Sequence, residues 1–419
     1  MRSLLSLLRL AVLWDRLRTN FWFTPAIMAA MAVALSFAMT RLDAALDRRA
    51  YDSFALLYLF GPEGARAILS AIASSMITVA GITFSITMLT LQLASSQFGP
   101  RVLRNFMRDR GNQVVLGTFI STFVYCLLVL RTVKGVEGDS FVPHLSVAFG
   151  VLLAISSLAI LIYFIHHTAH SIRIETLLQS LAAETESAIV NLYPDRVGEA
   201  PDRDDSTPLP DFGRAGTVRP AVGGYVQAID AEALLTVATR HDLVLEIAAR
   251  PGAFVTTHDA LMRVEPPERL SDEVARALAV GVVVGAERTP DQDLAFSIQR
   301  IVEIAQRSLS PGINDPTTAL YCIDRLREAF VRLAERDIPA GRRLDDNGHL
   351  RIITQPATLE DLACPAFAAV ARYAGADSDV REALAAAIDR VLDVSRSASV
   401  PRLVDLRFEL RQRRSIAAR

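Results

Sequence analysis

Four long apolar stretches dominate the first part of the chain. A helix needs about 20 predominantly apolar residues to cross a bilayer. The pattern predicts membrane spans at Phe23–Met39, Ala67–Ser96, Val114–Leu130 and Leu145–Ile165. The second stretch is longer than a bilayer requires, so we expect this helix to tilt or to project into the cytoplasm.

Charged residues return after Ile165, and the hydrophobic pattern changes. Short runs with strand composition lie between positions 224 and 287 and predict a small sheet or barrel. Apolar residues then recur at helical spacing, which predicts helices that begin at Thr289, Asp315, Thr358, Ser378 and Pro401. A strand is expected at 350–354, and the helix from Asp315 should bury Ala319, Ile323, Leu326, Phe330 and Leu333.

The expected fold is therefore an α-helical membrane domain of four transmembrane helices, followed by an α+β domain with a small sheet or barrel and a helical C-terminal part. No sequence period of about 20 to 50 residues repeats. The expected regions are an N-terminal interfacial helix at 1–22, the transmembrane domain at 23–171, a connecting helix and linker at 172–220, a β-rich subdomain at 221–288 and a mainly helical subdomain at 289–419.

Small and polar residues form one stripe along the second span. At about 100° per residue they fall within an arc of roughly 80°. The stripe consists of Ser70, Ser74, Thr78, Gly81, Ser85, Gln92 and Ser96. Lipid cannot satisfy these polar groups, so this face should meet another helix or water, as close helix packing or as a pore lining. A lesser stripe of Thr83, Thr87 and Thr90 on the opposite face indicates that protein surrounds most of this helix.

Arginines follow the second span directly. Gly99-Pro100 breaks the helix, and Arg101, Arg104 and Arg108 then recur at spacings that share one face. Contact with lipid headgroups explains them. If the stripe lines a pore, the same arginines form its cytoplasmic mouth and predict an anion-leaning conductance.

The charge of the loops predicts the orientation in the membrane. Arginines precede the first span and fill the loop between spans two and three, whereas the other two loops balance basic and acidic residues. Asp43 is among the acidic residues expected in the first external loop. The positive-inside rule then places both termini in the cytoplasm. The net charge of −2 and the lack of long runs of like charge argue against nucleic-acid binding.

The most distinctive stretch of the second half is S-P-G-I-N-D-P-T-T at 310–318. Asp315 can cap the following helix, and Pro316 suits its first turn because the missing N–H costs nothing there. Asn314, Thr317 and Thr318 surround the same helix N-terminus, which is a general anion site, although the aspartate would repel phosphate. Two interpretations of this loop remain: it only caps the helix, or it binds a ligand through Asn314, Asp315, Thr317 and Thr318.

The motifs of common enzymes are absent: the sequence has no phosphate-binding P-loop, no dinucleotide fingerprint, no HExxH and no GxSxG. We expect no enzymatic activity, no catalytic residue and no cofactor. The three cysteines are far apart and suit apolar filling in a reducing compartment; they are Cys126, Cys322 and Cys364.

Three histidines, His166, His167 and His170, stand where the fourth span ends. No carboxylate or cysteine completes a metal-ligand set within the same turn, so interfacial polar side chains explain them better than a metal site.

Two stretches, GITFSITMLTLQLASSQFGPRVLRNF at 81–106 and SLSPGINDPTTA at 308–319, resemble a bacterial family of predicted membrane proteins with a domain of unknown function. The resemblance extends over nearly the whole chain. It implies a location in the bacterial inner membrane and four spans followed by a cytoplasmic domain.

The leading hypothesis is a homo-oligomeric inner-membrane ion channel, with the second span lining the pore and the cytoplasmic domain regulating it. The expected partners are the lipid bilayer, further copies of the chain and the permeating ions. The alternative is a nonconducting membrane-anchored sensor or scaffold that binds a partner or small ligand through its cytoplasmic domain.

Overall fold

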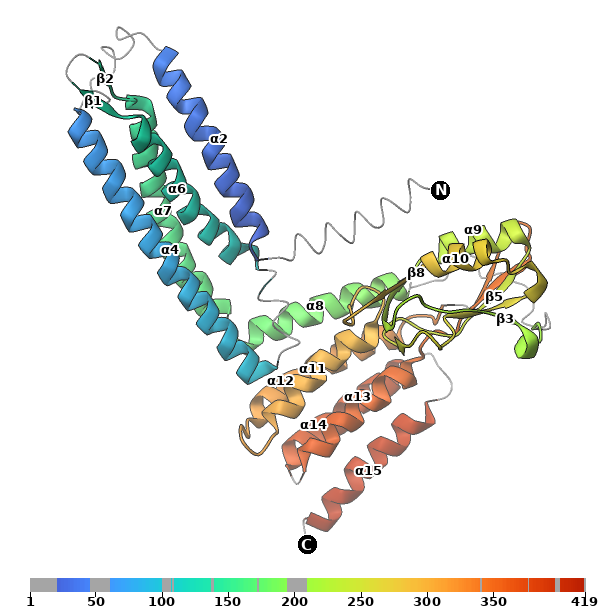
Figure 1. Ribbon diagram of the computed structural model, residues 1–419. Coiled ribbons are helices and arrows are strands. Elements are labelled where there is room, and N and C mark those ends of the chain that lie inside the picture. The colour runs from blue at the N-terminus through green and yellow to red at the C-terminus, as the bar shows by residue number, and fades with distance from the viewer. Residues whose placement is uncertain are drawn as a thin grey trace. The chain divides into compact units, whose positions relative to one another are not determined.

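The computed structural model describes residues 21–45, 61–99, 107, 109–136, 139–171, 173–193, 209–339, 341–375, 377–395 and 400–417. The chain forms two compact units, Met1–Thr176 and Leu177–Arg419 (Figure 1). The expected helix at 1–22 lies outside the described residues except for its last two positions, and so do Arg101, Arg104 and Arg108.

The described part of the first unit is a bundle of four helices, α2 (Phe23–Ala45), α4 (Pro62–Phe98), α6 (Arg110–Thr132) and α7 (His144–Ser171). All four are long and apolar enough to cross a membrane, and they coincide with the four predicted spans. The chain direction alternates from one helix to the next (Figure 1). Helix α6 packs against the other three and buries Phe119, Tyr125 and Val129 completely.

Polar contacts tie the helices together at both ends of the bundle. At one end the Thr24 hydroxyl of α2 donates to the Gln113 side-chain oxygen of α6 at 2.7 Å. At the other end Arg66 of α4 donates to the carbonyl of Val133 at 2.9 Å. A short antiparallel hairpin, β1 (Lys134–Val136) and β2 (Asp139–Phe141), follows Val133 and leads into α7.

Asp43 does not lie in an external loop as the sequence suggested. It belongs to the last turn of α2, and only 4% of it is exposed. Its carboxylate accepts the N–H groups of Leu145 and Ser146, both at 2.9 Å, and the Ser146 hydroxyl at 2.5 Å. The first N–H groups of a helix have no acceptor within that helix. Asp43 therefore caps α7 from a neighbouring helix, next to the positive end of the α7 dipole.

In the second unit, the described residues form two sheets. Its five-stranded sheet has the order β3 (Gly216–Val218), β7 (Met262–Glu265), β5 (Val244–Ile247), β10 (Leu350–Ile353) and β9 (Arg342–Leu344). Its three-stranded sheet has the order β6 (Phe254–Val255), β4 (Gly224–Ile229) and β8 (Val282–Gly285). The predicted region of strands is thus confirmed, as two small sheets.

Two helices lie between these strands, where the sequence predicted none. They are α9 (Ala231–His241) and α10 (Asp272–Val280). Asp230 and Ser271 cap them by accepting the N–H groups of Ala233 and Val274. Both helices contribute to one hydrophobic core with the strands, through Leu234 and Leu278 among others.

These elements reveal a structural repeat that has no counterpart in the sequence periodicity. The order β4–α9–β5 recurs as β7–α10–β8. Strand β4 pairs antiparallel with β8, and β5 pairs antiparallel with β7. Strands β4 and β5 of the first half thus each pair with a strand of the second half.

The structure differs from the predicted element starts at two places. Residues Gly216–Val218, which the sequence placed in the linker, form β3 and pair with β7. Helix α11 (Leu294–Ser308) begins at Leu294 and not at Thr289, because Asp293 accepts the N–H of Phe296 and caps the helix there.

The rest of the second unit is helical. Helices α12 (Pro316–Ala334), α13 (Leu359–Ala374), α14 (Ser378–Val394) and α15 (Pro401–Ala417) begin within one residue of the predicted starts. The five residues expected on the inner face of α12 are all buried. Helix α8 (Ile174–Leu192) joins this bundle through Arg300 of α11, which is 2% exposed and pairs with Glu184 at 2.6 Å. A second ion pair joins Glu186 of α8 to Arg332 of α12.

Arg351 of β10 lies between two carboxylates. Its Nε donates to Asp345 at 2.8 Å and its Nη1 to Asp242, the residue that ends α9, at 2.7 Å. Hydrogen bonds from the Arg351 side chain and from the His349 N–H lower the pKa of Asp345 to about 2. The ionised carboxylate therefore helps to hold β10 against the end of α9.

Replacing Asp43 by Ala should destabilise the first unit by about 3 kcal/mol, because three hydrogen bonds to a buried carboxylate are lost and two N–H groups lose their acceptor. Thermal unfolding of the full chain in detergent measures the effect. Glu63→Ala, in the exposed first turn of α4, is the matched control and should leave the melting temperature nearly unchanged. Equal shifts for the two variants would contradict the capping role.

The second unit should lose stability in acid through Asp345. A lowered pKa means that this carboxylate stabilises the fold fully above its unfolded pKa of about 4, and that the contribution disappears as the pH falls through about 2. Melting temperatures of the full chain between pH 5 and pH 2 should therefore fall less steeply for Asp345→Asn than for the parent. Asp346→Asn, at the exposed neighbouring position, should follow the parent curve.

Candidate functional site

Helix α4, which carries the polar stripe, is 37 residues long. At 1.5 Å per residue it extends about 55 Å, well beyond the roughly 30 Å core of a bilayer. It begins after Gly61 with Pro62 in its first turn and ends before Gly99, whose φ of 97° disfavours other residues. No charged residue follows Arg66 within the helix, so its whole length after the first turns is uncharged.

The seven stripe residues all lie on the exposed face of α4, and the described parts of the bundle leave them uncovered. They are Ser70, Ser74, Thr78, Gly81, Ser85, Gln92 and Ser96. A Cβ added at Gly81 would meet no atom within 4 Å. The structure thus brings the stripe together on one open face of a single chain.

The hydroxyl groups of this face donate to carbonyls of their own helix. Ser74 donates to Ser70, Thr78 to Ser74 and Ser85 to Gly81, at 2.8 to 2.9 Å. Ser96 donates to the Leu93 carbonyl at 2.9 Å. A hydroxyl has one proton and two lone pairs, so each oxygen can still accept a hydrogen bond from outside. These four hydroxyls therefore present uncharged acceptors, and Gln92 adds an amide that can donate as well as accept.

The lesser threonine stripe lies on the opposite face of α4 and is buried. Thr83, Thr87 and Thr90 are at most 9% exposed, and Thr87 donates to the Thr83 carbonyl at 2.8 Å. Ala73 and Ala80 are buried on the same side. Small side chains here let α4 approach its neighbours closely, which accounts for this stripe by packing alone.

The outer faces of α2 and α7 differ from that of α4. Helix α2 exposes Met31, Leu35 and Phe37, and α7 exposes a row of aliphatic side chains that includes Ile155 and Ile162. Such faces suit contact with acyl chains. Helix α4 also exposes aliphatic residues beside its stripe, Leu89 among them, but it combines them with the small and hydroxyl residues. The outer face of α4 is thus suited to protein or water.

The far end of α4 projects beyond its neighbours (Figure 1). Phe84 lies beside Trp22 at the start of α2, with ring centroids 6.0 Å apart, and Ala80 shares a core cluster with Val115 near the start of α6. Gln92 and Ser96 follow two to three turns later. The last turns of α4 therefore extend past the starts of α2 and α6.

The loop at 310–318 forms the expected helix cap. Asp315 accepts the N–H and the hydroxyl of Thr318, at 3.1 and 2.6 Å. Asn314 adopts a left-handed conformation with φ of 49°, and it is exposed, as is Thr317. The structure brings Asp315 and Thr318 together for capping and leaves the other two residues of the candidate ligand loop on the surface.

A polar cluster at the end of α7 was missed by sequence reasoning. His167 Nε2 lies 2.6 Å from the carboxylate of Asp109, which also accepts the N–H of Gly111 and caps α6. The ring of Tyr163 stacks on His167 at 5.3 Å. Sequence spacing indicates partners within one turn of the histidine, whereas Asp109 is 58 positions away. Among the described residues no group of three or more histidine, cysteine or acidic side chains could hold a metal ion.

Comparison with known proteins supports the membrane assignment. Residues 18–390 match the family model of predicted membrane proteins designated DUF2254. The chain belongs to this family. Two similar relatives are the uncharacterized proteins Mb1321c of Mycobacterium bovis and Rv1290c of Mycobacterium tuberculosis, each 33% identical over 345 residues. The alignments cover 80% of this chain and 64% of each relative, so the chain spans less than two thirds of their length. No solved structure matches the chain.

Membership of this family confirms the resemblance found in the sequence, and the four candidate spans agree with it. The family description states a membrane protein and assigns no chemistry. The function of this family member must therefore be argued from its own side chains.

The two faces of α4 should respond differently to a larger side chain. Thr87→Leu adds volume inside the bundle and should destabilise the chain by about 1–3 kcal/mol. Ser85→Leu, on the open face, should change the unfolding free energy by less than about 0.5 kcal/mol. Thermal unfolding of monomeric protein in detergent compares the two, and a larger loss at Ser85 would contradict the assignment of the faces.

Proposed function

We propose that this protein is a homo-oligomeric ion channel of the bacterial inner membrane, in which α4 lines the conducting path and the second unit regulates it. The observation that supports this proposal is the open row of small and hydroxyl residues on α4, whereas the described outer faces of α2 and α7 are mainly apolar. Both termini lie in the cytoplasm in this proposal, as the positive-inside rule indicates.

Association of several copies follows from the shape of the α4 face. Small residues allow the backbones of two membrane helices to approach closely, and the open space at Gly81 leaves room for a neighbouring helix. Copies arranged around an axis would turn the stripe toward a common centre. Water in that centre would accept or donate hydrogen bonds that acyl chains cannot provide.

The chemistry of the stripe sets an expectation for the ions. Its hydroxyl protons are already donated to backbone carbonyls, so the oxygens that remain are acceptors. Acceptors stabilise water and cations rather than anions. An anion-leaning conductance therefore depends on the arginines that follow α4 in the sequence, Arg101, Arg104 and Arg108, which would concentrate anions at the mouth.

A nonconducting sensor or scaffold is the second candidate function. The same internal hydrogen bonds favour it, because hydroxyls with an acceptor in their own helix can be buried in a dry contact between copies at low cost. In this case the membrane unit only anchors the chain. The second unit would bind the partner or small ligand, with Asn314 and Thr317 available on the surface.

Ion flux from liposomes that contain the purified full chain tests conduction. The parent protein should release trapped ions, and Ser85→Trp should lower the flux at least tenfold because the bulky ring fills the path. Val114→Trp, at an exposed position of α6, is the matched control and should leave the flux unchanged. If the parent shows no ion flux at any voltage, pH or salt concentration, or if Ser85→Trp carries the same flux as the parent, the proposed pore is contradicted.

Labelling of single cysteines separates the two candidates without any flux. In a background without Cys126, Cys322 and Cys364, a membrane-impermeant thiol reagent should modify Ser85→Cys if the stripe faces water. A dry contact between copies should protect this cysteine in the membrane and expose it after dissociation in detergent.

A further inference from the structure

The outer face of α7 continues from an apolar row into a cluster of basic side chains. Leu152, Ile155 and Ile162 are each more than half exposed. At the spacing of an α-helix, His166 and His170 extend the same face toward the helix end. Arg173 follows immediately and is exposed as well.

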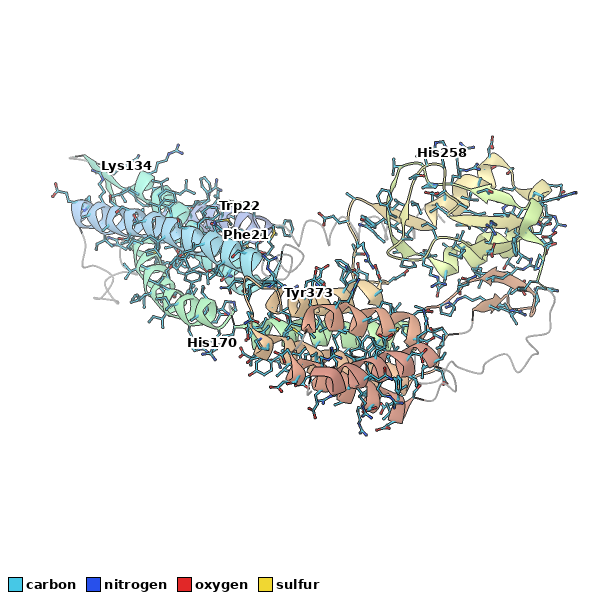
Figure 2. All side chains as sticks on the ribbon, turned by 90° about the horizontal axis from the view of Figure 1, so that it is seen from below. Phe21, Trp22, Lys134, His170, His258 and Tyr373 are labelled. Atoms are coloured by element: carbon cyan, nitrogen blue, oxygen red, sulfur yellow. The ribbon has the colours of Figure 1, made fainter. Side chains whose placement is uncertain are left out.

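The two histidines are arranged as a pair. Their ring centroids lie 4.2 Å apart, and the Nδ1 of His170 is 3.1 Å from the His166 carbonyl. The Arg173 N–H donates to the carbonyl of His170 at 3.3 Å, which keeps Arg173 next to the end of the helix. Figure 2 shows His170 on the outside of the bundle, at the same end as Phe21 and Trp22. Trp22 is 55% exposed, as is usual for tryptophan at the depth of lipid headgroups.

Two carboxylates stand close in the chain to the arginines of this end, Asp109 before Arg110 and the exposed Glu175 after Arg173. Asp109 is hydrogen-bonded to His167 and to the Gly111 N–H. Arg110, the first residue of α6, is exposed and adds a positive charge beside this pair. The face therefore combines one arginine and two imidazole rings at one depth with an exposed aliphatic row at the next.

We propose that this face of α7 binds an anionic phospholipid. The headgroup phosphate would pair with the Arg173 guanidinium beside the rings of His166 and His170, and an acyl chain would lie along Ile162, Ile155 and Leu152. A lipid is the occupant because Arg173 and the two imidazole rings continue directly into exposed aliphatic side chains, which a free phosphate would leave uncovered. The proposal does not depend on conduction through α4.

Native mass spectrometry of the full chain, extracted from vesicles of phosphatidylglycerol and phosphatidylcholine, tests this site. The parent should retain phosphatidylglycerol in preference to phosphatidylcholine by roughly fivefold, the scale set by a basic residue at a membrane surface. A variant with His166→Ala, His170→Ala and Arg173→Ala should lose the preference. Arg131→Ala removes an exposed arginine at the other end of the bundle and should keep it.

Three outcomes would overturn the proposal. The triple variant could keep the parent's preference while circular dichroism shows it folded. The parent could retain the two lipids equally. Excess inorganic phosphate could displace the retained lipid completely, which would show a phosphate site without a role for the aliphatic row.

Discussion

The packing of α6 against α2, α4 and α7 is the contact on which the first unit depends. Because α6 is surrounded by all three, each of the others keeps one inner face toward the bundle and turns one face outward. Backbone groups in hydrocarbon are satisfied within their own helix, so the side chains alone decide what each outer face can meet. This arrangement buries the threonines of α4 at 83, 87 and 90 and leaves its serines outside.

Charged groups in this unit act mainly at the helix ends. Asp43 and Asp109 cap α7 and α6 from opposite ends of the bundle. Each also joins two helices: Asp43 of α2 binds Ser146 of α7, and Asp109 at the start of α6 binds His167 of α7. The same carboxylates therefore fix helix starts and the position of one helix against the next. The interior between them is left uncharged, as the cost of burying an ion in hydrocarbon requires.

The sequence predicts the parts of this fold that depend on local pattern. The four spans follow from length and hydropathy, and the inner face of α12 follows from its spacing of apolar residues. The contacts of Asp43 with Ser146 and of Asp109 with His167 could not be predicted, because they join residues 103 and 58 positions apart. Helices α9 and α10 were not predicted because they are only 11 and 9 residues long and lie between runs with strand composition. The helical spacing of the polar residues predicts the stripe on α4. The environment of this face depends on other molecules, which the sequence of one chain does not describe.

The exchange of strands between the two halves of the second unit has a kinetic consequence. Neither β4 nor β5 can complete its antiparallel pairing before the chain has reached β8 and β7. Their contacts bridge long loops, whose closure must precede any gain from pairing and which slow folding relative to local hairpins. During synthesis, the first half therefore remains without its complete sheets until the second half has left the ribosome.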